Sequence, residues 1–148
     1  MNNYPEWWDA TVTIYNKFVD PQTQLVTWYS TTVENCFWKD VGSKILVGNV
    51  TLDGNYIICR IPVNEQYLDP GEWKDTPSYY RADYFTIQPD DILIKGAVTD
   101  TIDEGVSGNR ATDLIKKYKA SGSCMQVDTV VNNTGGGRGD EHYSVKGI

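Results

Sequence analysis

Short runs of alternating apolar and polar residues, each ended by a turn, constrain the fold of this chain most. The first run, Thr11–Phe18, has the period of two that is typical of a β-strand, in which successive side chains point to opposite faces. It ends at Asp20–Thr23, where the proline favours a tight turn. Leu25–Val33 then returns as a second run of β-branched and aromatic residues. The two runs predict a β-hairpin.

Most of the remaining segments also predict short strands, and one segment predicts a helix. In Ala111–Ala120 the apolar residues recur at helical spacing, and Gly122 follows as a stop signal. Asn55–Pro62 is apolar on both faces, which indicates a central, well-buried strand. Asp83–Ile87 and Ile92–Val98 predict a second hairpin, and further strands are expected at Cys36–Lys39, Lys44–Val50, Met125–Val131 and Glu141–Gly147. We therefore predict a mainly β fold, a small antiparallel β-barrel or sandwich of about eight strands with one short helix and long loops.

The length of 148 residues suits a single domain. We predict one barrel-like domain over residues 1–148, with an N-terminal arm at 1–10. Residues 63–82 contain several turn signals together with tryptophan and tyrosine. Because flexible linkers are rarely so aromatic, we expect a long ordered excursion there.

Charge limits the function classes. The chain has 20 acidic and 13 basic side chains and a formal charge of −7, whereas a protein that grips nucleic acid needs an excess of Lys and Arg. Sequence-specific DNA or RNA binding is therefore not expected as the main activity. The start of the sequence does not resemble a signal peptide and no apolar run is long enough to cross a bilayer. We expect synthesis in the cytoplasm and no membrane partner.

Few residues suggest catalysis or metal binding. Cys36, Cys59 and Cys124 are far apart in sequence and have apolar neighbours, which predicts reduced core residues and no metal or other cofactor. His142, the only histidine, is expected to be structural, although a pairing with a cysteine in space stays open. The acidic pairs Asp90–Asp91 and Asp103–Glu104 are expected to be solvated. These residues do not predict an enzyme.

Aromatic residues and one glycine-rich loop are the candidate contact sites. Trp28 and Trp38 lie on predicted strands and are expected in the core. Aromatic residues in irregular segments either fill their own core or serve as anchors for another protein. The loop before the last strand lacks the Lys-Ser/Thr ending of a phosphate loop and is read as a hairpin loop or an assembly contact. The candidate contact residues are Trp7, Trp8, Trp73, Tyr79, Tyr80, Gly135, Gly136, Gly137 and Arg138.

The order of several short motifs resembles that of a known protein group. The motifs are Thr11–Lys17, Trp28-Tyr29, Cys36–Trp38, Ile58–Pro62, Ala82–Thr86, Asp90–Gly96 and Gly139–Gly147. Over roughly residues 11–147 the chain resembles head-completion proteins from the structural cassettes of tailed phages and prophages of Gram-positive bacteria. Pro89-Asp90-Asp91 stands where that group has a Gly-Asp pair, and the helix at 111–120 and the excursion at 63–82 are not part of its minimal pattern.

The resemblance implies a structural role in the neck of a virion. Proteins of this group are small β-barrels that form a ring below the portal and adaptor, close the DNA-filled head and dock the tail. The ring is commonly sixfold for a stopper and twelvefold for an adaptor. Packaged DNA would pass nearby without being gripped, and the −7 charge is compatible with an acidic channel. A tail-terminator or minor capsid protein is an alternative within the virion, and a small carbohydrate-binding or cell-wall-directed module is an alternative of another class.

Overall fold

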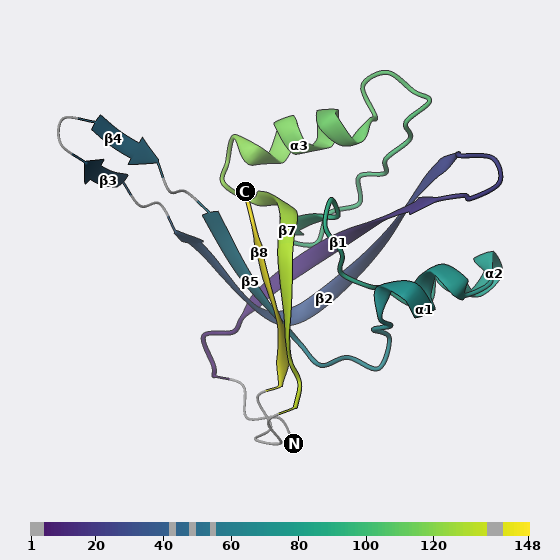
Figure 1. The fold of residues 1–148 in the computed structure, drawn as a ribbon, viewed down its shortest axis with the longest axis horizontal. Coiled ribbons are helices and arrows are strands. Elements are labelled where there is room, and N and C mark those ends of the chain that lie inside the picture. The colour runs from purple at the N-terminus through teal and green to yellow at the C-terminus, as the bar shows by residue number, and fades with distance from the viewer. Residues whose placement is uncertain (1–4, 42–43, 48–49, 54–55, 136–140) are drawn as a thin grey trace.

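A closed antiparallel barrel of six strands forms the centre of the molecule in a computed structural model of the chain (Figure 1). The structure describes residues 5–41, 44–47, 50–53, 56–135 and 141–148. Around the barrel the strand order is β1-β2-β5-β8-β7-β6. The strands are β1 (Ala10–Val19), β2 (Val26–Val41), β5 (Tyr56–Pro62), β6 (Ile92–Lys95), β7 (Cys124–Asn133) and β8 (His142–Gly147). The predicted mainly β, barrel-like fold is confirmed, but the barrel has six strands and not about eight, and the sandwich alternative is wrong.

The β1–β2 hairpin is the longest pairing of the barrel. It runs from Val19 opposite Val26 to Ala10 opposite Cys36, with a register shift near the second end. Asn35 has a φ of 60° there, and such a bulge bends a strand. Past the bend β2 leaves β1 and pairs with β5 through Phe37–Val41. The separate strand that we predicted at Cys36–Lys39 is therefore the second half of one bent strand.

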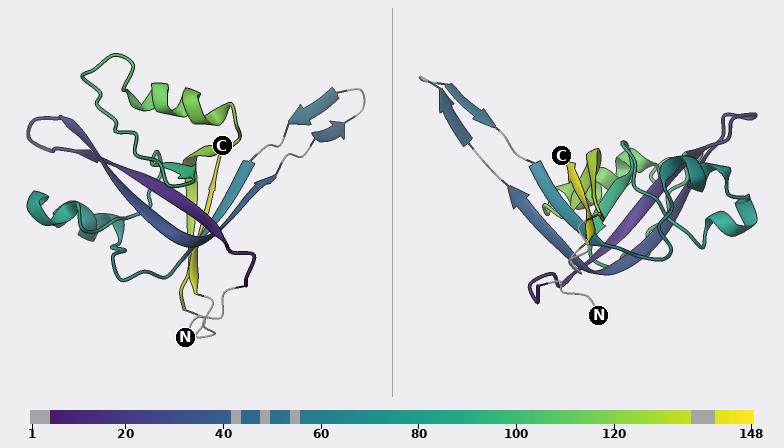
Figure 2. Two further views of the ribbon diagram at one scale, coloured as in Figure 1. Left: turned by 180° about the vertical axis from the view of Figure 1, so that it is seen from behind. Right: turned by 60° about the horizontal axis from the view of Figure 1, so that its bottom comes forward.

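A two-stranded hairpin, made of β3 (Lys44–Val47) and β4 (Val50–Asp53), extends β2 and β5 away from the barrel. Figure 2 shows this β3–β4 hairpin projecting beyond the other elements from two directions. Its strands pair with each other and with no other strand of the described residues. The single strand predicted at Lys44–Val50 is thus wrong, because the chain turns back between Val47 and Val50.

The described residues form three helices on the outside of the barrel, where one was predicted. The expected helix is present as α3 (Ala111–Lys119). The excursion at 63–82 contains α1 (Pro70–Asp75) and α2 (Ser78–Arg81). Proline is favourable at the start of α1, because the amide hydrogen that it lacks would have no partner within the helix. No helix among the described residues is long and apolar enough to span a membrane.

The prediction of a second hairpin, from residues 83–87 and 92–98, is wrong. Residues 83–87 form a single bridge, from Phe85 to Tyr67, and β6 ends at Lys95. Phe85, Thr86 and Ile87 are nevertheless buried against the barrel. Their apolar alternation thus reflects contact with the core and not strand pairing.

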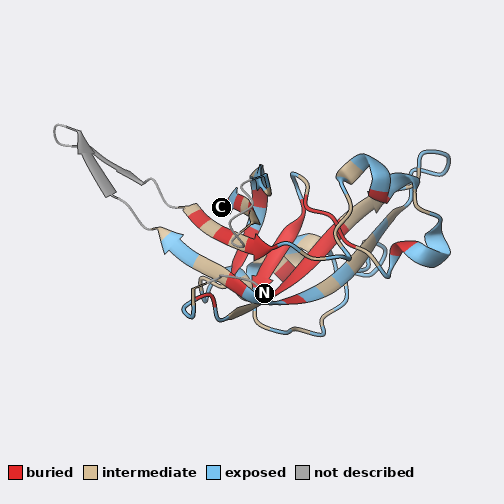
Figure 3. Cartoon of the chain, turned by 90° about the horizontal axis from the view of Figure 1, so that it is seen from below, coloured by how far each residue is buried: buried red, intermediate tan, exposed pale blue. Residues whose placement is uncertain are grey.

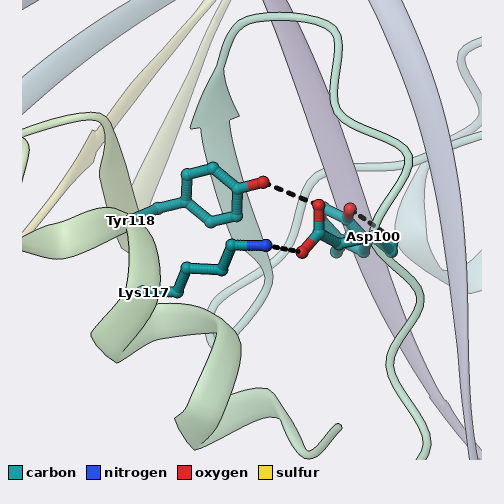
Figure 4. Close-up of polar contacts among 4 residues, drawn as sticks. Asp100, Lys117 and Tyr118 are labelled. Carbon is teal, nitrogen blue, oxygen red and sulfur yellow. Dashed lines mark hydrogen bonds and ion pairs between the residues drawn. The ribbon is translucent and has the colours of Figure 1, made fainter.

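The core has two parts, and the buried residues are concentrated in the strands of the barrel (Figure 3). The larger part fills the barrel, and the smaller part lies between β1, β6 and α3. The loop after β6 is fastened to α3 by Asp100, which accepts hydrogen bonds from Tyr118 at 2.6 Å and from Lys117 at 2.7 Å (Figure 4). Tyr15 of β1 donates to the Asp100 carbonyl at 2.6 Å. These contacts hold α3 on one face of the β1–β2 hairpin.

Candidate functional site

The other face of the β1–β2 hairpin carries α1 and α2. Trp73 is fully buried against Phe18 and Tyr29 with perpendicular rings. The Arg81 guanidinium lies 3.7 Å from the centre of the Phe18 ring and donates to the Thr76 carbonyl at 2.7 Å and the Tyr29 hydroxyl at 3.2 Å. A cation stacked on an aromatic ring is favourable, more so where water is excluded. Arg81 therefore fixes both short helices to the hairpin.

This clamp presents Tyr79 and Tyr80 to solvent. Their exposed fractions are 75% and 54%, and their ring centres lie 4.6 Å apart. The two rings thus form an exposed aromatic pair on a helix whose last residue, Arg81, is buried. Tyrosine is well suited to anchor a protein contact, because it combines a large apolar ring with a hydroxyl.

The other sequence candidates have different surroundings. Trp7 is exposed, at 68%, whereas Trp8 is 6% exposed and packs against Phe37 and His142. Trp8 and Trp73 thus fill the core of their own chain, which was the alternative to a contact role, and neither belongs to the candidate surface. Trp28 and Trp38, expected in the core, are half-buried at its margin. Gly135 is exposed, and Gly136, Gly137 and Arg138 lie outside the described residues.

A pocket of about 390 Å³ opens beside the C-terminal end of α3, where β2 and β5 leave the barrel. Its walls are largely apolar, and Lys119 and Asp40 supply charge. The volume is within the range of small-ligand pockets. The lining residues are Asp40, Tyr56, Ile57, Lys119, Gly122, Cys124 and Ile148.

A buried carboxylate lies near the turn before β6. Asp91 is fully buried and accepts hydrogen bonds from the Asn16 side chain at 2.7 Å, the Lys17 amide at 3.0 Å and the Gln88 amide at 3.1 Å. Burial raises the pKa of Asp91 to about 7, although all three donors favour the charged form. Asp91 was predicted to be solvated, and this prediction is wrong, whereas its neighbour Asp90 is exposed.

The second acidic pair also differs from its prediction. Asp103 is exposed, but Glu104 is half-buried and accepts hydrogen bonds from the Trp28 indole and the Ala111 amide, each at 3.1 Å. Glu104 therefore joins the hairpin to the start of α3. Asp91 and Glu104 were both expected to be solvated, and both instead hold elements of the fold together.

The cysteines are buried and free, as predicted. Burial raises the pKa of the Cys59 thiol well above its usual value and that of Cys124 to about 11. Nucleophilic cysteines have the opposite property, a lowered pKa that yields the thiolate. His142 contacts the Trp8 ring and lies 3.3 Å from the Asn133 side chain. The raised pKa values of Cys59 and Cys124 keep these two thiols protonated at neutral pH.

Comparison with known proteins adds one result. A family model described as a family of unknown function, DUF6751, matches residues 7–148. The chain belongs to this family. No curated protein and no solved structure matches the sequence or fold.

The DUF6751 chain has two surfaces whose positions in the fold could not be predicted from the sequence alone. One is the Tyr79–Tyr80 pair, whose residues were candidates but whose fixed position depends on Arg81. The other is the pocket beside α3, which joins residues from β2, β5, β7 and the chain segment after α3. No local pattern could have revealed it, because its lining residues are scattered over the sequence. Both features are suited to binding another molecule.

Proposed function

We propose that this protein is a structural component of the phage neck that assembles into a ring, closes the DNA-filled head and docks the tail. It acts by contact and not by catalysis. The proposal rests on the resemblance of motif order to head-completion proteins, and the fold adds physical support to it.

The observation that carries the proposal is the projecting β3–β4 hairpin (Figure 2). A two-stranded hairpin is at best marginally stable alone in water. Five of the eight residues in its two strands are Ile, Leu or Val, namely Ile45, Leu46, Val47, Val50 and Leu52. Such a hairpin gains stability when a surface of another molecule covers it. A subunit that contributes a hairpin to its neighbour is well suited to a ring or a stacked assembly.

Imaging of intact virus particles with and without the gene tests this proposal. We expect a ring of this chain between head and tail, and particles that lack it should contain packaged heads that leak DNA. Stable full heads beside abnormally long tails would instead identify a tail terminator. Normal particles without the chain would contradict any role in the virion.

Binding to cell-wall fragments tests the alternative outside the virion. Under our proposal, calorimetry with peptidoglycan fragments gives no heat of binding and a zymogram shows no cleared zone. Saturable binding that Tyr79→Ser and Tyr80→Ser abolish would favour a carbohydrate-binding module.

A further inference from the structure

We propose that the Tyr79–Tyr80 pair of one copy of this chain docks into the pocket beside α3 of the next copy. This inference rests on the proposed ring and names its contact surfaces. The partner is a second copy because the two surfaces complement each other in charge and in the chemistry of their side chains.

The two surfaces lie on different sides of the molecule. Successive residues of β2 point to opposite faces, so that Trp28 packs toward α3 while Tyr29 contacts Trp73 and Arg81. The helices α1 and α2 therefore lie on the other side of the hairpin from α3. In Figure 1 the pocket end of α3 lies near the C-terminus and the β3–β4 hairpin, while α2 lies at the far side of the molecule. A contact between two different surfaces is heterologous, and copies joined in this way close into a ring when the rotation allows.

The surface around α1 and α2 is acidic. Six exposed carboxylates and one exposed cation, Lys74, lie between residues 63 and 90, a stretch that the structure describes throughout. Two of the carboxylates, Glu72 and Asp75, are three residues apart on α1 and so share a face. The carboxylates are Glu65, Asp69, Glu72, Asp75, Asp83 and Asp90.

The helix α3 carries positive charges at the same spacing as the carboxylates of α1. Lys116 and Lys119 are exposed and also three residues apart, and Lys119 lines the pocket. Lys117 is already paired with Asp100, but Lys116 and Lys119 have no ion-pair partner in the part of the chain that the structure describes. The C-terminal end of a helix favours cations, so the presence of lysines there does not by itself indicate a contact between copies. The equal spacing of two unpaired lysines and two carboxylates on opposite sides is what favours a contact between copies.

The pocket beside α3 has the chemistry to accept a tyrosine side chain. The pocket offers apolar walls from Tyr56, Ile57 and Ile148 to a tyrosine ring, and its Asp40 carboxylate can accept a hydrogen bond from a tyrosine hydroxyl. Residues that dominate binding energy are commonly aromatic groups in such pockets, with charged pairs at the rim. Tyr79 and Tyr80 would supply the anchor and the four charged residues the rim.

Charge reversal with mixing tests the contact in the purified full-length chain. Variant A carries Lys116→Glu and Lys119→Glu, and variant B carries Glu72→Lys and Asp75→Lys. We expect each alone to weaken self-association, measured by sedimentation at increasing protein concentration, by about tenfold or more. A mixture of A and B should recover it, since each new contact again joins opposite charges. Glu34→Lys with Asp128→Lys, exposed sites on β2 and β7 with the same charge change as B, should leave self-association unchanged.

The anchor has its own test. Tyr79→Ser with Tyr80→Ser should abolish self-association while the thermal midpoint stays near that of the wild type, because both rings are exposed. Carbodiimide coupling of isotopically distinct copies should join Lys116 or Lys119 of one copy to Glu72 or Asp75 of another. A wild-type chain that stays monomeric and yields no such cross-link at its highest soluble concentration would overturn the inference, as would failure of the A and B mixture to recover association.

These results are separable from the proposed function. If mixing restores association but imaging finds no ring in the neck, the contact stands and the neck role fails. If the ring is found in the neck but charge reversal and the Tyr79 and Tyr80 substitutions leave it intact, the neck role stands and this contact is wrong.

Discussion

Burial and hydrogen bonding have opposite effects on the pKa of Asp91. It joins β1, through Asn16 and Lys17, to the segment before β6, through Gln88. Asn16 also bonds the backbone of Thr86 in both directions. A single buried carboxylate thus fastens a segment that has almost no strand pairing of its own.

The stability of the protein should depend on Asp91 between about pH 4 and pH 7. Since the pKa of Asp91 rises from 3.8 when unfolded to about 7 when folded, the folded state retains a proton that the unfolded state has lost. The free energy of unfolding should therefore fall as pH rises through this window, by up to about 4 kcal/mol. Asp91→Asn should remove the slope in urea unfolding measured across this range, and Asp128→Asn, at an exposed site, should keep it. An equal slope in Asp91→Asn would contradict the assignment.

Gly147 marks a place where β8 passes very close to β7. A Cβ atom there would overlap the carbonyl oxygen of Gln126, a main-chain atom that cannot rotate away. We expect Gly147→Ala to cost about 2–3 kcal/mol of unfolding free energy. Gly71→Ala is the matched control, because nothing lies within 4 Å of its added methyl group and alanine favours helix α1. Equal thermal midpoints for the two variants would show that β7 and β8 can separate locally.

At the scale of elements, sequence predicted what local patterns determine. The helix α3 and the strands β1, β7 and β8 followed from periodicity and turn residues. The strand predicted at 83–87 failed, because Phe85 and Ile87 are apolar for contact with the core and pair with no neighbouring strand. The burial of Asp91 could not be predicted either, since its three donors come from β1 and the turn before β6. The Arg81 clamp likewise requires Phe18 and Tyr29, which are more than 50 residues away in sequence.

The β3–β4 hairpin should be dispensable for the barrel but not for assembly. Val41 and Tyr56 are register partners in β2 and β5, so that an Asn-Gly turn can replace residues 42–55 and close the pair. We expect the free energy of unfolding to change by no more than about 1 kcal/mol, because a hairpin outside the sheet contributes little alone. Particles that carry this variant in place of the wild type should lack the ring and leak DNA. Normal rings with the shortened chain would remove the main support for the proposed function.

At the scale of the whole molecule, the fold distributes contact surfaces around a closed barrel. Each strand of the closed barrel has a neighbouring strand on both sides. The barrel therefore has no open sheet edge through which copies could aggregate. The surfaces available for contact are then the projecting hairpin, the Tyr79–Tyr80 pair and the pocket beside α3. Because the β3–β4 hairpin and α2 lie at opposite sides of the barrel (Figure 1), one chain can touch several neighbours at once. Such a layout is compatible with the assembly proposed above.

The net charge of −7 predicts how the chain behaves toward DNA. Affinity for duplex DNA comes largely from phosphate neutralisation by Lys and Arg. Among the described residues, twelve exposed carboxylates outnumber eight exposed cations, and one of these cations, Lys117, is already paired with Asp100. The purified protein should therefore cause no shift of duplex DNA in a gel at physiological salt. Variant B, which exchanges two carboxylates for lysines, tests whether charge alone limits binding, since it should bind more tightly than the wild type at low salt. Salt-dependent binding by the wild-type chain would show a basic surface and would contradict a neck protein that lets DNA pass without gripping it.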